Sequence, residues 1–142
     1  MRRLPSRLGG LAAAAMLTVG LAQPSQAADS AYFEFTDITH ERAIVRIDDP
    51  ATIKHARDLI SGETDERPHL LGRIVKRQAD YNPRWSFHYN PDTVQFFDYG
   101  IEVCDASLPY VEDHLDEAGG AFLPGLVWCP WTSRLIREVP AP

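Results

Sequence analysis

The chain has 142 residues, with 20 acidic and 14 basic side chains, and 44% of its residues are hydrophobic. This length suits one domain with one hydrophobic core. The acidic balance argues against binding to nucleic acid or to an anionic membrane surface, because both carry negative charge.

Residues 1–27 have the pattern of a secretory signal peptide. Three arginines precede an apolar run over residues 8–22, and Ser25 and Ala27 occupy the two small-residue positions before a cleavage site. We therefore expect cleavage after Ala27 and one exported domain over residues 28–142, extracellular or periplasmic, with a net charge of −9. The apolar run is shorter than the roughly 20 residues of a membrane span, so no stable membrane anchor is expected.

Two alternating segments open the exported domain. Residues 31–36 place two phenylalanines against polar neighbours, and residues 42–48 alternate in the same way after a polar turn. Alternation with a period of two is typical of β-strands with one buried face. The two segments are expected to form a β-hairpin.

A helix is predicted over residues 50–61. Asp49 is a good N-cap, Pro50 suits the first helical position, and Gly62 can end the helix in a left-handed conformation. Its apolar stripe consists of Ile53, Ala56 and Ile60. This stripe is expected to face the core.

The middle of the chain predicts further strands. Residues 70–77 are apolar on both faces, which favours a central strand, and residues 85–89 form an aromatic strand. Asn90 can cap a short helix that begins at Pro91. Residues 99–104 fit either a strand or a helix, and Gly100 favours the strand.

A second main helix is expected after its N-cap Ser107 and before Gly119 and Gly120. A loop then extends to Trp131, and residues 133–139 form a last strand. The order predicts an α+β domain: a mostly antiparallel, possibly mixed sheet of five to six strands with two main helices packed on it.

The two cysteines, Cys104 and Cys129, favour a disulfide, because an even number of cysteines in an exported domain is typical of paired thiols. The alternative is a reactive Cys104 thiol at the start of a helix, with His88 or His114 nearby, in a hydrolase. No sequence pattern indicates a metal site or a cofactor, and a binding role is favoured over an enzyme.

The segment 119–131 is the best candidate for a binding surface. Its apolar side chains fall outside the predicted regular structure, two prolines and the predicted disulfide stiffen it, and a stiff loop binds at low entropic cost. The candidates are Phe122, Leu123, Leu126, Trp128 and Trp131. An extracytoplasmic protein is the first expected partner, and a glycan or small molecule near Trp85, Trp128 and Trp131 is the second. The alternative is that these side chains cover the core.

Several segments together resemble a known family. They are Tyr81-Asn82-Pro83-Arg84-Trp85-Ser86-Phe87-His88, Ile101-Glu102-Val103-Cys104-Asp105, Gly119-Gly120-Ala121-Phe122-Leu123-Pro124-Gly125 and Trp128-Cys129-Pro130-Trp131. The chain resembles small bacterial secreted proteins similar to the N-terminal domain of a slime-mould calmodulin-binding protein. The resemblance spans nearly all of the exported domain. It implies calmodulin binding and assigns no catalytic residues.

Overall fold

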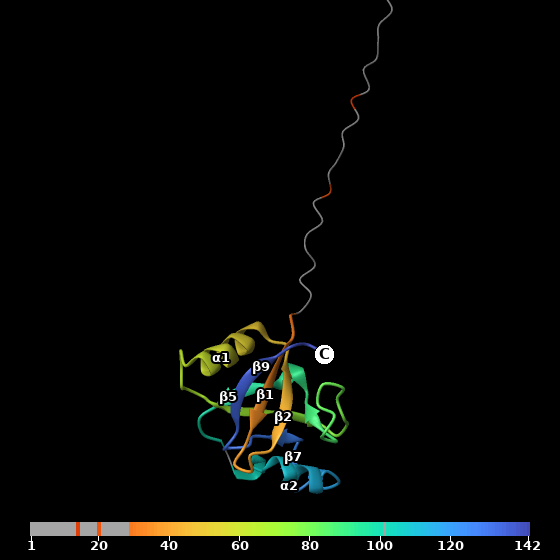
Figure 1. Ribbon diagram of the computed structural model, residues 1–142. Coiled ribbons are helices and arrows are strands. Elements are labelled where there is room, and N and C mark those ends of the chain that lie inside the picture. Colours follow the sequence, from red (N-terminus) through yellow and green to blue (C-terminus); the bar gives the residue numbers. More distant parts are fainter. Residues whose placement is uncertain (1–13, 15–19, 21–28, 101) are drawn as a thin grey trace, which may run out of the picture.

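The computed structural model describes residues 14, 20, 29–100 and 102–142. The predicted cleavage site after Ala27 lies outside the described residues, as does most of the predicted signal peptide. The domain that follows has its two α-helices at opposite ends of a body of β-strands (Figure 1).

The first sheet has three antiparallel strands: β1 (Ala31–Thr36) lies between β2 (Arg42–Ile47) and β9 (Arg134–Val139). The predicted hairpin of β1 and β2 is confirmed, with Phe33 opposite Val45. The alternation places Phe33, Phe35 and Val45 in the core. A register shift between Glu34 and Phe35 interrupts the pairing of β1 with β9.

The second sheet is built around β3 (His69–Val75), which confirms the predicted central strand. β3 pairs antiparallel with β4 (His88–Tyr89), β5 (Gln95–Phe97) and β8 (Val127–Trp128). The predicted strand over residues 85–89 shortens to two residues. Between β4 and β5 a 3₁₀ turn, η1 (Pro91–Thr93), follows Asn90, whose side chain caps it as predicted.

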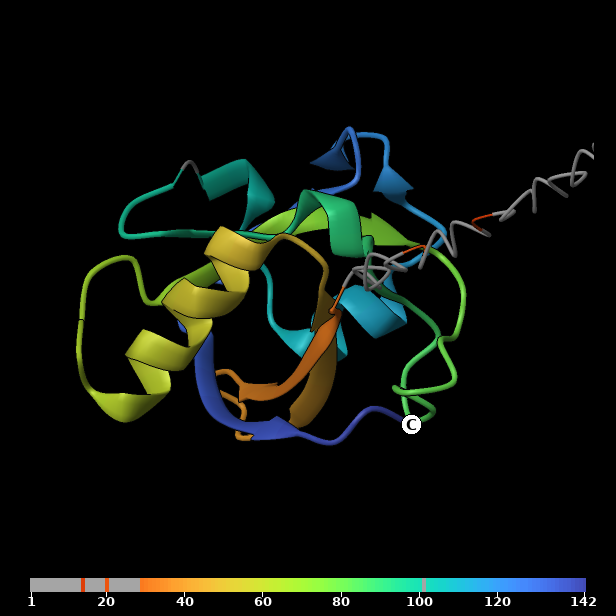
Figure 2. The same cartoon turned by 90° about the horizontal axis from the view of Figure 1, so that it is seen from above.

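Helix α1 (Pro50–Ser61) has the predicted bounds. The Asp49 carboxylate accepts the Thr52 N–H at 2.8 Å, and Gly62 ends the helix with φ of 81°. Ile53 and Ala56 are buried, whereas Ile60 is 38% exposed and lies at the edge of the predicted stripe. Figure 2 shows α1 beside β9, where the guanidinium of Arg57 pairs with Glu138 at 2.8 Å.

Helix α2 (Leu108–Asp113) begins after the predicted cap Ser107 but is much shorter than predicted. The expected continuation to Gly119 fails because like charges stand four residues apart, Glu112 with Asp116 and Asp113 with Glu117, and such pairs destabilise a helix. The predicted strand over 99–104 is also wrong. Residues Glu102–Cys104 form a 3₁₀ turn, η2, and Ile101 lies outside the described residues.

The core lies between the two sheets, with Trp128 near its centre. The Trp128 ring stacks on Tyr89 with centroids 4.9 Å apart and meets Phe35 at 6.2 Å and Phe87 at 5.4 Å. These contacts join β1, β4 and β8. The predicted α+β class with mostly antiparallel strands is therefore confirmed, although the strands divide between more than one sheet.

Candidate binding surface

The segment predicted to be a loop contains regular structure. β6 (Ala118–Gly119) and β7 (Phe122–Pro124) form a short parallel pair, and β8 pairs with Gly72 and Arg73 of β3. Residue patterns could not predict these strands, because strands of two or three residues are too short to show a period. The pairing of β8 with β3 draws half of the segment into the core.

Three of the candidate binding residues are buried, so the expectation that they face solvent is wrong. Leu123, Trp128 and Trp85 all lie in the core. The indole N–H of Trp128 donates to the Ala106 carbonyl at 2.9 Å, and that of Trp85 donates to the Arg42 carbonyl at 2.8 Å. Because ring faces and indole N–H groups are already used, these side chains support the structure and leave no exposed tryptophan platform for a sugar.

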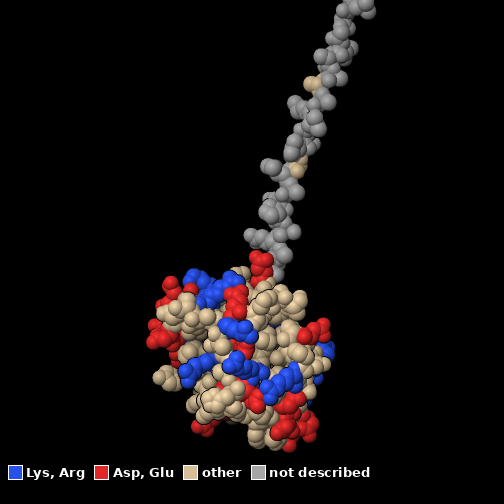
Figure 3. Space-filling view, in the orientation of Figure 1, with Lys and Arg blue, Asp and Glu red and all other residues tan. Residues whose placement is uncertain are grey.

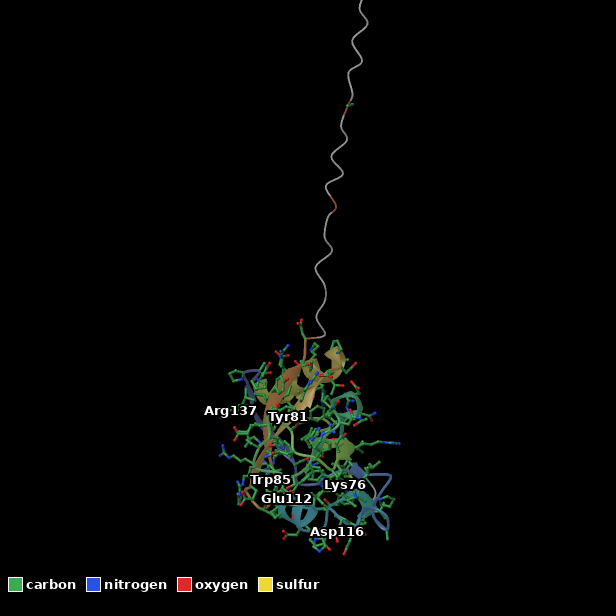
Figure 4. The ribbon with its side chains drawn as sticks, turned by 90° about the vertical axis from the view of Figure 1, so that its right-hand side faces the viewer. Lys76, Tyr81, Trp85, Glu112, Asp116 and Arg137 are labelled. Atoms are coloured by element: carbon green, nitrogen blue, oxygen red, sulfur yellow. A yellow bond between two sulfur atoms is a disulfide. The ribbon has the colours of Figure 1, made fainter. Side chains whose placement is uncertain are left out.

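Phe122 and Leu126 are partly buried and pack against the core. The Phe122 ring meets Tyr110 at 5.4 Å and His114 at 6.1 Å, and the rings of Tyr110 and His114 stack with centroids 4.0 Å apart. These contacts hold β7 against α2. Nearby, the Glu112 carboxylate of α2 accepts the backbone N–H and the hydroxyl of Ser86, next to Trp85 (Figure 4).

A disulfide joins Cys104 and Cys129, as predicted, and ties two distant segments together. The Cys129 N–H also donates to the Cys104 carbonyl at 2.7 Å, and the Trp131 N–H donates to Asp105 Oδ1 at 2.9 Å. One covalent bond and two hydrogen bonds therefore fix the segment that ends at Trp131 against the one that ends at Asp105.

Around this disulfide lies a small apolar cluster, separate from the main core. Its partly buried members are Leu71, Val127 and Trp131. On the chain leading to Cys104, Tyr99 is 94% exposed and Val103 is 57% exposed. We call Leu71, Tyr99, Val103, Val127 and Trp131 the disulfide-tied surface.

Sequence reasoning missed Tyr99 and Val103, because their alternation favoured a strand in which one of them would be covered. The usable signal was Gly100 beside an aromatic residue, just before a cysteine whose bonding fixes the segment. The missed pair and Trp131 together form the apolar part of the domain that reaches solvent beside the disulfide.

Acidic groups surround this surface. The segment 85–133 contains eight aspartates and glutamates and neither lysine nor arginine. Asp98, Glu102 and Asp105, next to the apolar residues, are all exposed. The electrostatic potential at the disulfide-tied surface is therefore negative.

The predicted alternatives for catalysis fare differently. The hypothesis of a Cys104 nucleophile is wrong, because the sulfur is held in the disulfide. The Nδ1 atom of His88 contacts the Arg77 carbonyl at 2.6 Å, and that of His114 contacts the Tyr110 carbonyl at 2.8 Å. Among the described residues, no group of three His, Cys, Asp or Glu side chains could hold a metal ion.

The fold and the surface define an α+β domain of the binding type, stapled by one disulfide. Residues 29–142 match the family model of the BP-74 N-terminal domain, and the chain belongs to this family. Neither the curated proteins nor the solved structures contain a match to the chain. In the described part of the chain, no helix is long and apolar enough to cross a membrane.

Proposed function

We propose that the domain is exported and binds a protein partner through the disulfide-tied surface. The observation that carries this proposal is the exposure of Tyr99 and Val103 on a segment that the disulfide holds in place. Single exposed apolar side chains are common on protein surfaces, but several beside one another on a fixed loop favour a binding role.

Rigidity supports the proposal. Binding loses affinity when flexible side chains and loops must be ordered, and a segment already fixed avoids part of that loss. The disulfide and the Trp131–Asp105 hydrogen bond supply this restraint beside the two exposed side chains. Tyrosine and tryptophan are also the residues most often found at the energetic centre of interfaces.

The charges indicate the chemistry of the partner. Asp98, Glu102 and Asp105 form an acidic rim, so the matching patch would have an apolar centre and lysine or arginine around it. Attraction across such a rim mainly accelerates association and is screened by salt. Binding should therefore weaken as the salt concentration rises.

Calmodulin binding remains a prediction from the family resemblance. Its usual targets are basic amphipathic helices. Here α1 carries only Lys54 and Arg57, each paired with a carboxylate, and α2 has no basic residue. Retention of the protein on calmodulin resin, with and without Ca²⁺, tests this prediction separately.

Export is supported by the pattern of residues 1–27 and by the disulfide, since disulfides persist in oxidising compartments. If the protein is expressed in its own cell, N-terminal sequencing of the extracytoplasmic form should begin at Ala28. Retention of residues 1–27 on a cytoplasmic protein would contradict export.

The binding proposal is tested by capture from the culture medium and envelope extract of the source cells. A photo-crosslinking amino acid at Tyr99 should attach the domain to a defined protein, whereas the same amino acid at Ile60, an exposed apolar position on α1, should not. Capture should be lost in Tyr99→Ser/Val103→Ser and kept in Ile60→Ser. Equal crosslinking from both positions, or capture that survives the double substitution, would contradict the proposal.

A further inference from the structure

The two outer edges of the three-stranded sheet differ. At the edge formed by β2, the Ile44 N–H donates to Asn82 Oδ1 at 3.0 Å and the Arg42 carbonyl accepts the Trp85 indole N–H at 2.8 Å. Side chains of the 82–85 segment therefore satisfy and cover this edge. The outer edge of β9 has no such cover, because within the described residues its backbone bonds only to β1.

An uncovered edge presents a row of N–H and C=O groups to which another strand can bind. β9 is six residues long, about as long as a typical strand, so it offers a full-length template. Proteins that recognise extended peptides in this way gain affinity from main-chain hydrogen bonds and specificity from pockets for alternate side chains.

Two hollows meet at this edge. One, of about 490 Å³, lies toward α1 and its following loop and includes Leu59 and Pro68. The other, of about 600 Å³, lies toward the turn between β1 and β2 and includes Ile38 and His40. Both are lined by Arg134 and Leu135. Successive side chains of an added strand point to opposite faces, so the two hollows suit alternate residues.

Charge selects the occupant. Arg134 is exposed and has no ion pair in the described part of the chain, whereas Arg137 is paired with Glu34. Figure 3 shows lysine and arginine side chains gathered over the side of the domain that carries β9, β1 and β2. A second copy of the chain would bring the arginines of two β9 strands together, and the like charges would repel. An acidic strand would instead be attracted.

The hollow beside Ile38 suits a carboxylate better than the other one. Glu63 and Asp65 line the hollow toward α1 and would repel an anion. In the hollow toward the β1–β2 turn, the Asp37 carboxylate is already used, since it accepts the N–H groups of Thr39 and Leu108. Arg134 and His40 are the groups of that hollow that remain to contact an acidic side chain.

We propose that the free edge of β9 binds an extended peptide segment of a partner protein as an added strand, with an acidic side chain of the peptide against Arg134. This site is separate from the disulfide-tied surface. It is an interaction surface for an acidic, extended segment and does not depend on the function proposed for that surface.

The test uses the protein as exported, with a displayed library of random linear ten-residue peptides as the probe. Selected peptides should carry Asp or Glu, and their binding should shift the backbone amide NMR signals of β9. N-methylation of every second peptide amide should abolish binding in one phase and leave it intact in the other, because only one edge of the peptide faces β9. Loss of one exposed ion pair weakens binding about fivefold, so Arg134→Gln should have this effect.

Arg73→Gln is the matched control, since Arg73 is an exposed arginine on β3. It should leave peptide affinity unchanged, as should Tyr99→Ser/Val103→Ser. Failure to select any binding peptide, NMR shifts that fall elsewhere, or insensitivity to the phase of N-methylation would overturn the proposal. Each of these outcomes leaves the disulfide-tied surface open to its own test.

Discussion

Two tryptophans three residues apart have opposite surroundings. Trp128 is 1% exposed, stacks on Tyr89 and donates its indole N–H to a backbone carbonyl. Trp131 is only partly buried, belongs to the cluster around the disulfide, and its indole nitrogen has no hydrogen-bond partner within the described residues. Cys129 lies between them.

The difference separates two tasks that the same segment performs. Up to Trp128 the chain completes the core between the two sheets. Beyond Cys129 it is held at the surface, next to Tyr99 and Val103, by the disulfide and by Asp105. Residues before the disulfide should therefore affect stability, and residues around it should affect binding.

The largest effect is expected from Trp128→Ala. Truncating a fully buried aromatic side chain typically costs about 3–5 kcal/mol, and here it also leaves the Ala106 carbonyl without its donor. Urea unfolding measures the loss. Trp131→Ala is the matched control, and we expect less than half of the effect because the ring is only partly buried. Equal losses at the two positions would contradict the division between core and surface.

Removing the disulfide should come next. The bond closes a loop of 25 residues, and the chain-entropy model gives a stabilisation of about 3.5 kcal/mol. Cys104→Ser/Cys129→Ser should unfold at lower urea concentration by that amount and should also lose its partner, since the surface is no longer fixed. A variant that retains full capture would show that the restraint is not needed.

Glu34→Gln should have a smaller effect that depends on pH. Hydrogen bonds from Arg42 and Arg137 lower the pKa of the buried Glu34 carboxyl below its ordinary value of 4.5. The carboxylate therefore stabilises the fold above pH 4.5, and this contribution is lost as the pH falls through the lowered pKa.

At pH 7 the loss in Glu34→Gln should be about 1–2 kcal/mol, the range for charge-assisted hydrogen bonds that are only partly replaced. Comparing the unfolding free energies of the wild type and the variant from about pH 7 to about pH 2 checks this. The gap should close toward acid pH, and a constant gap would mean that the charge of Glu34 is not its source.

The parts of the fold that could be predicted from the sequence are those with local signals. Asp49, Pro50 and Gly62 defined α1, and alternation defined β1, β2 and β9. Prediction failed where tertiary contacts decide: β8 is a strand only because β3 lies beside it, and α2 ends early where acidic side chains repel one another. The cysteine pairing was predictable from export. The burial of Trp85, Leu123 and Trp128 was not, because it depends on which sheet face each residue meets.

The most direct test of the division between core and binding surface is to measure the stability and the capture of Tyr99→Ser/Val103→Ser together. Both side chains are largely exposed, so the free energy of unfolding should change by about 0.5 kcal/mol or less per substitution. The partner captured by the wild type should nevertheless be lost. Unchanged stability with lost capture is the predicted result, whereas a large loss of stability, or capture that persists, would contradict it.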